Sequence, residues 1–456
     1  MQETSALSRA FTELKGKQAR YARLYAYYHG NAPVVYATER LRGDFRDLTA
    51  RWSENWASVV VDSLLDRISL QGLKLDDTTA NDALEELWDS LDLSLDSDDI
   101  SRDVAVCSEG FLMVERADDG SVRAFANAPH LCTAVYREDD PREMEYAAKW
   151  FDRGGQAHLT LYYSDHLVHY VATKPRGELL DHRAFMLDPE FPDGEEPNEY
   201  GRIPLFHFKR DRNSPYGELQ NVIPLQDALN KLFADMMVSA EFGAAPQRYA
   251  IMTAGTDTSE LKNGPNKVWQ IFFDAEGNVK PEVGQFAATE LKNFLDAIDH
   301  IATKIAVITR TPKHYLLQQG EMSGEALIAE EAPLSRKAGK YTDRLGVTWC
   351  QAAQFILELD GFTVTPNDLE PIWEDVRTVQ PLTEATIHKT NVEAGIPIEV
   401  QLEDEGWTDE QIARIGDAEA QSTVRQTDAA TVARDEAMRR FAAGQVPGVA
   451  NSVGAE

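Results

Sequence analysis

Two apolar stripes of helical spacing, separated by the segment 246–288, constrain the fold of this chain more than any other feature. They predict one helix over 224–243 and a second over 289–310. Each stripe advances by alternating steps of three and four residues, which suits nearly parallel packing against neighbouring helices. Each helix would be roughly 30 Å long. The apolar positions are Leu225, Leu229, Leu232 and Met236 in the first helix, and Leu291, Phe294, Ile298, Ile301, Ile305 and Ile308 in the second.

A third long helix is predicted from Ser323 to Gly361, and Pro333 within it should kink it or divide it into two. Between the first two helices, 267–273 reads as a strand. The segment 311–323 contains Pro312 and two glycines, so it reads as a loop. The stripe of the third helix is Leu334, Ala338, Tyr341, Leu345, Thr348, Ala352, Phe355 and Leu359.

The flanking regions carry weaker signals. Residues 1–75 read as helical, and 111–210 alternate like short antiparallel strands, with an exposed loop expected at 188–204. The region 381–456 holds two short helical signals and ends in small polar residues that we expect to be disordered. The N-terminus has no apolar stretch of the kind that a cleaved secretory signal needs.

The amino-acid composition excludes several classes of protein. The chain has 456 residues, of which 43% are hydrophobic, with 76 acidic residues against 45 Lys and Arg, for a net charge of −31. This balance argues against tight nucleic-acid binding over the general surface, although it allows a surface that nucleic acid passes without sticking. No apolar run is long enough to cross a bilayer. Three widely spaced cysteines indicate a reducing compartment and no disulfide framework.

The sequence lacks the common catalytic signatures. It has no phosphate-binding P-loop, no HExxH and no GxSxG, so neither an ATPase of that class nor a zinc protease is expected. Acidic residues at 92–99 lack the glycine and closing glutamate of a calcium loop, and the histidines at 158–182 do not predict a metal site. We expect no cofactor. A carboxylate pair for hydrolysis stays open in so acidic a chain.

Several short motifs follow one another in a recognisable order. They are Tyr27–Asn31 (YYHGN), the helix 52–67 (WSENWASVVVDSLLDR), Leu87-Trp88 followed by 105–114 (AVCSEGFLMV), 203–206 (IPLF), and 216–219 (YGEL) followed by 225–231 (LQDALNK). Together with the arrangement of long helices, they resemble the portal proteins of tailed bacteriophages, in particular the siphophage group with a Gp6-like portal. The resemblance covers about 20–415, and its most specific part is 203–231.

The resemblance implies an α+β portal-type fold with long stem helices, an α/β wing, a small β-containing clip and a helical C-terminal crown region. The implied parts are an N-terminal wing over 1–215, a first stem helix over 216–245, a clip over 246–288, a second stem helix over 289–310, a tunnel loop over 311–323, a long kinked helix returning to the wing over 324–380, and crown-like helices with a flexible tail over 381–456.

The resemblance also implies a function without catalysis. Such subunits form a ring, expected to be a dodecamer, at one capsid vertex of the virion, after synthesis in the host bacterial cytoplasm. The ring forms the channel for double-stranded DNA. It docks the terminase large subunit during packaging and later the head-tail adaptor protein, and it contacts the major capsid and scaffolding proteins. Energy for packaging would come from a separate ATPase, and no membrane is involved.

The implied roles fall on three sets of residues. The apolar stripes of the two stem helices would pack subunits together, and the tunnel loop would make weak contacts with DNA, for which Lys313 is the one certain cation. The tunnel-loop candidates are Lys313, His314, Tyr315, Gln318, Gln319 and Glu321, and the clip-docking candidates are Lys267, Trp269, Phe272 and Glu276. Two alternatives remain at this point: an acidic soluble hydrolase with a carboxylate pair, and another phage minor structural protein.

Overall fold

The computed structural model divides into two compact units, Met1–Thr378 and Val379–Glu456, which are described separately. The first unit contains nearly all the residues that the structure describes. The second contributes only short segments, so most of the predicted crown-like helices and the tail lie outside the described residues. The described ranges are 2–31, 54–117, 119–179, 181–212, 214–244, 248–253, 268–273, 282–285, 290–317, 322–374, 389–397 and 400–401.

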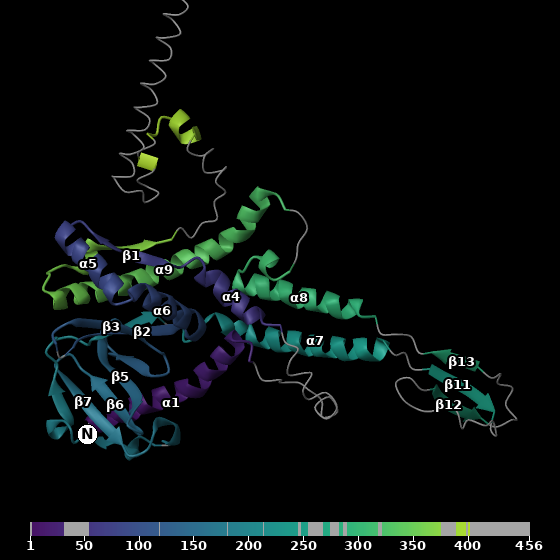
Figure 1. The fold of residues 1–456 in the computed structure, drawn as a ribbon, viewed down its shortest axis with the longest axis horizontal. Coiled ribbons are helices and arrows are strands. Elements are labelled where there is room, and N and C mark those ends of the chain that lie inside the picture. The colour runs from purple at the N-terminus through teal and green to yellow at the C-terminus, as the bar shows by residue number, and fades with distance from the viewer. Residues whose placement is uncertain are drawn as a thin grey trace, which may run out of the picture. The chain divides into compact units, whose positions relative to one another are not determined.

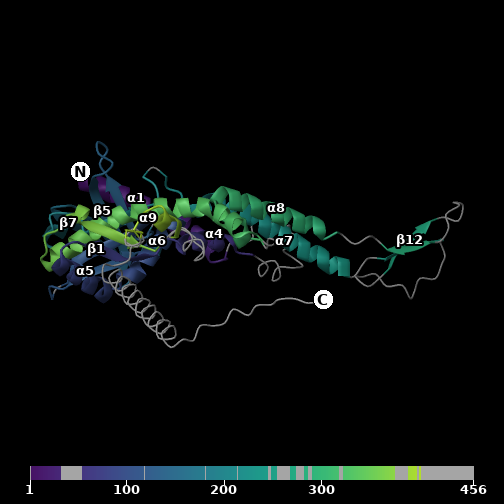
Figure 2. The same cartoon turned by 90° about the horizontal axis from the view of Figure 1, so that it is seen from above.

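The first unit combines long helices with several small sheets (Figures 1 and 2). The helices are α1 (Gln2–Tyr28), α4 (Trp56–Leu65), α5 (Thr78–Ser90), α6 (Leu93–Cys107), α7 (Ile223–Ala244), α8 (Lys292–Thr309) and α9 (Gly324–Asp360). Two short 3-10 helices matter below: η4 (Glu218–Asn221) and η5 (Lys313–Tyr315).

Most of the strand pairs are antiparallel. Three strands form the sheet β10-β2-β3, and six form the sheet β4-β5-β6-β7-β8 with β9 beside β7. A third sheet, β12-β11-β13, contains a parallel pair, and β1 pairs with β14. The strands are β1 (Leu70–Leu75), β2 (Glu109–Arg116), β3 (Val122–Asn127), β4 (Cys132–Tyr136), β5 (Met144–Arg153), β6 (Gln156–Tyr162), β7 (His166–Ala172), β8 (Met186–Leu187), β9 (Glu195–Pro197), β10 (Leu205–Lys209), β11 (Arg248–Thr253), β12 (Val268–Phe273), β13 (Glu282–Gln285) and β14 (Leu369–Trp373).

Strand β2 joins two hydrophobic cores because its successive side chains point to opposite faces. Leu112 and Val114 belong to the large core built with the helices. Phe111 and Met113 belong to a smaller core shared with β4 and β5. Both faces of β2 are therefore covered, which explains why it reads as an unbroken apolar run rather than an alternating one.

Helix α9 is continuous over 37 residues, although Pro333 lies inside it. Ser323 caps its N-terminus by accepting a hydrogen bond from the backbone N–H of Ala326, and Gly361 ends it in the left-handed conformation at φ +102°. Deep in the core, the Trp349 ring lies 5.5 Å from that of Trp88 and 4.9 Å from that of Phe208. The division at Pro333 that the sequence allowed does not occur.

The other predicted elements agree with the structure in outline. The helices predicted at 224–243 and 289–310 correspond to α7 and α8, and the strand at 267–273 corresponds to β12. Two predictions differ from the structure. The loop at 188–204 contains β9, which pairs with β7, and the region 1–75 predicted as helical ends in strand β1, which pairs with β14. The whole is a mixed α+β fold with long helices and mostly antiparallel sheets.

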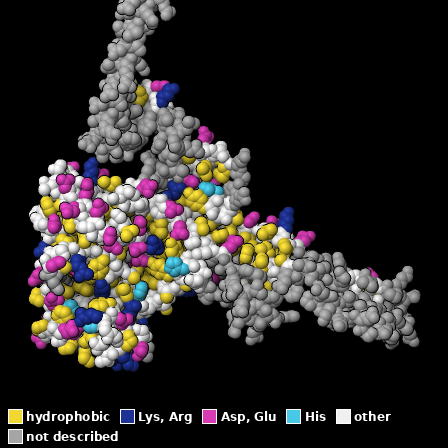
Figure 3. Space-filling view, in the orientation of Figure 1, with side chains coloured by type: hydrophobic (Ala, Val, Ile, Leu, Met, Phe, Trp, Pro, Cys, Tyr) yellow, Lys and Arg dark blue, Asp and Glu magenta, His cyan; other side chains and the backbone are white. Residues whose placement is uncertain are grey.

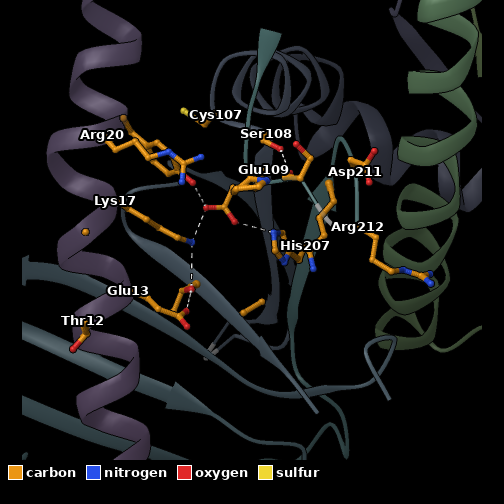
Figure 4. A pocket seen from close by; sticks show the side chains of 17 residues that line it. Thr12, Glu13, Lys17, Arg20, Cys107, Ser108, Glu109, His207, Asp211 and Arg212 are labelled. Atoms are coloured by element: carbon orange, nitrogen blue, oxygen red, sulfur yellow. Dashed lines mark hydrogen bonds and ion pairs between the residues drawn. The ribbon is translucent and has the colours of Figure 1, made fainter. Parts of the chain in front are cut away.

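A buried polar network holds α1 against β2 and β10 (Figure 4). Lys17 Nζ lies 2.6 Å from Glu109 Oε1, and the Tyr21 hydroxyl donates to the same carboxylate. His207 Nε2 lies 3.1 Å from Glu109 Oε2, and its Nδ1 lies 3.2 Å from the Tyr136 hydroxyl. Glu109 therefore has two partners on α1 and one on β10.

The network fixes the protonation states of its members. Burial favours a higher pKa for Glu109, but Lys17 and His207 outweigh it and bring the pKa down to about 2. Burial lowers the pKa of His207 to about 4, despite the nearby carboxylate. At neutral pH, His207 is thus an uncharged donor to a charged Glu109.

Acidification should destabilise this part of the fold through both groups. Between pH 6.5, the ordinary pKa of histidine, and about pH 4, the histidine is protonated in the unfolded chain but not in the folded one. The free energy of unfolding therefore decreases as the pH falls through this range. The contribution of Glu109 is complete above pH 4.5 and is lost toward pH 2. The loss of each contribution lowers the free energy of unfolding by an amount on the order of 3 kcal/mol.

His207→Gln should reduce the decrease of the urea midpoint between pH 6.5 and 4 relative to the unmodified protein. Identical pH profiles of the two proteins would contradict this.

Candidate functional site

Helices α7 and α8 lie side by side in both views and cover each other only in part (Figures 1 and 2). The predicted stripes divide accordingly into three groups. Leu229, Ile298 and Ile305 are buried. The half-buried members are Leu225, Leu232, Met236, Phe294 and Ile301, and the exposed members are Leu291 and Ile308.

Helix α8 leaves large apolar side chains in water. The exposed fractions are 50% for Leu295, 73% for Val307 and 51% for Ile308. Figure 3 shows hydrophobic side chains gathered over α7 and α8. Large apolar side chains left in water are candidates for contact with another protein surface. These side chains do not share one helix face, since Leu291 and Leu295 lie near the start of α8 and Val307 and Ile308 near its end; we call the four the exposed apolar residues of α8.

The inner ends of these helices meet at a buried charge cluster. Glu218 of η4 lies 3.1 Å from Lys337 Nζ and 3.0 Å from an Arg210 nitrogen, and it accepts a 2.8 Å hydrogen bond from the Tyr341 hydroxyl. Lys337 Nζ also donates to the carbonyl of Thr309 at 2.8 Å. The cluster therefore joins η4, the end of α8, α9 and the residue after β10.

The sequence favours this geometry locally. Gly217 directly precedes η4, and a Cβ atom there would collide with the carbonyl oxygens of Ala105 and Val106 at the end of α6. Burial favours a higher pKa for Glu218, but Lys337 and Arg210 outweigh it, so the pKa is lowered and the carboxylate stays charged. Burial lowers the pKa of Lys337, against the pull of Glu218.

Two tunnel-loop candidates are engaged within the chain. His314 Nδ1 lies 3.3 Å from Glu330 and its Nε2 lies 3.4 Å from Glu331, both on α9. The Tyr315 hydroxyl lies 3.1 Å from Arg67, which itself lies 3.0 Å from Glu331. These contacts hold η5 on α9.

Lys313 lines a groove between the end of α8, η5 and α9. The groove has a volume of about 640 Å³, and its other cations are Arg310, Arg336 and Lys340. The carboxylate of Glu330 also lines the groove; it accepts a hydrogen bond from the backbone N–H of Lys313 and contacts His314. Among the described residues, no ion pair joins any of the four cations to a carboxylate. We call these four residues the basic groove.

The sequence reasoning missed most of the basic groove. Arg336 and Lys340 are four residues apart and so share one face of α9, a signal that was available in the sequence. Arg310 ends α8 in the left-handed conformation, at φ 60°. Its place beside Lys313 depends on how the chain turns into η5, which spacing does not reveal.

The remaining predicted site residues are not tested by this geometry. Gln318, Gln319, Glu321, Lys267 and Glu276 lie outside the described residues. Trp269 and Phe272 belong to β12. In the described ranges, no group of three or more His, Cys, Asp and Glu side chains is placed to hold a metal ion. Helices in those ranges are also too short or too polar to span a membrane.

Comparison with known families decides the class of protein. The family described as phage portal protein, SPP1 Gp6-like, matches residues 11–424. The chain belongs to this family. The portal protein of Mycobacterium phage D29 is 27% identical over 354 residues, covering 70% of this chain and 68% of its own. That of Mycobacterium phage L5 is 26% identical over 348 residues, covering the same shares.

Family membership confirms the resemblance drawn from the motifs. This portal protein is a structural component of the virion and not an enzyme, so the hydrolase alternative is removed. Membership places it at the capsid vertex, as part of an oligomeric ring with capsid partners.

Glu218→Gln should destabilise the portal protein strongly. The substitution leaves the buried Lys337 and Arg210 without their carboxylate, and removing one partner of a buried pair costs about 3–5 kcal/mol. Urea unfolding checks this. Lys337→Met should cost less, because Glu218 keeps Arg210 and Tyr341.

Asp99→Asn is the matched control, since it breaks an exposed pair with Arg102. It should cost less than about 1 kcal/mol. Equal losses from Glu218→Gln and Asp99→Asn would contradict a central role for the buried cluster.

Proposed function

We propose that this portal protein assembles into a closed ring, expected to be a dodecamer, around a channel for double-stranded DNA. The observation that carries the proposal is the set of exposed apolar residues of α8, whose large side chains the described residues cover only in part. A closed ring uses two different surfaces of each subunit in every contact. A neighbouring α7–α8 pair supplies the second apolar surface.

The parts of the chain then take the roles that the family resemblance implies. Residues 216–245 and 289–310 are the stem helices, 246–288 the clip and 311–323 the tunnel loop. Residues 1–215 form the wing, to which 324–380 returns, and 381–456 form the crown region. The clip docks the terminase large subunit and later the head-tail adaptor, while the capsid and scaffolding proteins contact the ring. Subunits are made in the host cytoplasm before entering the virion.

The charge distribution supports a channel through which DNA slides. A net charge of −31 keeps most of the surface from holding DNA. The basic groove supplies four cations at the base of the tunnel loop. Each phosphate contact adds affinity that salt weakens, so a small cationic set gives brief contacts rather than firm binding. His314 and Tyr315 act in this scheme by holding η5 on α9.

Ile308→Asp should prevent ring assembly while leaving the subunit folded. The side chain is 51% exposed in the single chain, so a charge there is hydrated until a neighbour covers it. Light scattering and single-particle images check the result, because a dodecamer of 51.0 kDa chains has a mass of about 610 kDa.

Two variants control this experiment. Met186→Asp changes an equally exposed side chain on β8, 56% exposed, and should still give rings. Ile298→Asp changes a residue only 6% exposed and should disrupt folding itself, seen by circular dichroism. If Ile308→Asp forms normal rings, this end of α8 is not part of the subunit contact.

Replacing Arg336 and Lys340 together by Gln should leave rings intact and weaken DNA retention. Each lost phosphate contact lowers the slope of log affinity against log salt by about 0.9. Filter binding of double-stranded DNA to purified rings at several salt concentrations measures this slope. Arg344→Gln is the control on the same helix, because Arg344 already faces Asp211 at 3.7 Å. An unchanged slope would exclude the basic groove from the DNA path.

A further inference from the structure

A second cationic pocket shares no lining residue with the basic groove. Its volume is about 550 Å³, and it is lined by α1, the junction of α6 and β2, β4, and β10 with the residues after it. Figure 4 shows Lys17 and Arg20 reaching from α1 toward Glu109, with His207 on the other side of the carboxylate. The volume is within the range of small-molecule sites.

Every carboxylate that lines this pocket has a partner. Glu109 is shared by Lys17, Tyr21 and His207, as described above. Glu13 accepts a 2.9 Å hydrogen bond from the Thr133 hydroxyl. Asp211 lies 3.7 Å from a guanidinium nitrogen of Arg344 on α9. The acidic groups are therefore committed to other side chains.

Three cations of the lining have no carboxylate partner among the described residues: Arg20, Lys209 and Arg212. Aromatic faces hold the two inner ones instead. The Arg20 guanidinium lies 5.2 Å from the Tyr21 ring centroid and 5.7 Å from that of Tyr216. Lys209 Nζ lies 3.6 Å above the centroid of Tyr136. Cation–π contacts of this kind position a cation without neutralising its charge.

The pKa of Lys209 is consistent with a missing counter-ion. Burial is the main cause that lowers it to about 8; Glu109 acts in the opposite direction, and Lys17 and Arg212 add to the lowering. Glu109 acts on Lys209 only through its charge, since its hydrogen bonds and its close ion pair go to Lys17, Tyr21 and His207. An anion in the pocket would compensate the positive charge of Lys209.

We propose that this pocket binds a phosphate group, as free phosphate or as a phosphomonoester, between Arg20 and Lys209. A phosphate carries a charge of about −1.5 to −2 at neutral pH, enough to balance Arg20 and Lys209, which are the two of the three uncompensated cations that aromatic rings hold. A single carboxylate would leave one of them unbalanced. The guanidinium of Arg20 offers a planar fork for two oxygens, and Lys209 supplies a point charge.

Isothermal titration of the full-length protein with sodium phosphate tests the proposal, with sodium chloride holding the ionic strength constant. We expect saturable binding, and Arg20→Gln and Lys209→Met should each weaken it at least tenfold. Arg23→Gln is the matched control, since Arg23 lies one turn further along α1, outside the pocket lining, over Tyr27. Binding that is absent, or equal in all four proteins, would overturn the proposal.

Two further titrations identify the source of the phosphate. Deoxyadenosine monophosphate should bind through the same two residues if the ligand is a phosphomonoester, whereas binding of inorganic phosphate alone would assign a free-phosphate site. Succinate serves as the dicarboxylate comparison. Succinate binding as tight as phosphate, with the same loss in Arg20→Gln, would replace the phosphate assignment by an acidic peptide site.

Discussion

The buried pair of Glu218 and Lys337 is the interaction on which the arrangement of the long helices depends. Two charges taken out of water are costly unless both are fully coordinated. Here the coordination comes from four separate parts of the chain, since Arg210, Tyr341 and the carbonyl of Thr309 complete it. The ends of α8 and η4 are thereby fixed on α9. Helix α8 is anchored at this end by polar bonds, and η4 fixes the chain just before α7.

Much of the fold could be predicted from periodicity alone. Leu334, Leu345 and Phe355 were predicted on the buried stripe of α9, and all three are at most 1% exposed. Trp349 and Ile356, which are equally buried, were missed. The reason is that α9 packs between β2 and β10 on one side and β14 on another, so its buried surface is wider than one stripe. A search for one apolar stripe cannot predict all the buried residues of a helix that is covered on two sides.

The site was less predictable than the fold because it depends on charges brought together from distant segments. The apolar stem positions follow from spacing, yet spacing cannot say that Ile305 is covered by its own chain and Ile308 is not. Lys313 was singled out as the certain cation, but its companions come from other elements. Similarly, Arg20 and Lys209 are far apart in sequence and line one pocket because contacts such as that of Lys17 with Glu109 hold α1 to the sheet. Such sets are properties of the tertiary structure.

The proline inside α9 has a mechanical consequence. Proline cannot donate to the carbonyl four residues earlier, which here is that of Ala329, so the helix lacks one rung of its hydrogen-bond ladder at Pro333. This rung separates a short N-terminal arm from a long arm of about 40 Å that is clamped in the core. Bending is therefore cheapest at that joint. A force on residues 324–332 therefore bends the helix at Pro333, while residues 334–360 keep their position in the core.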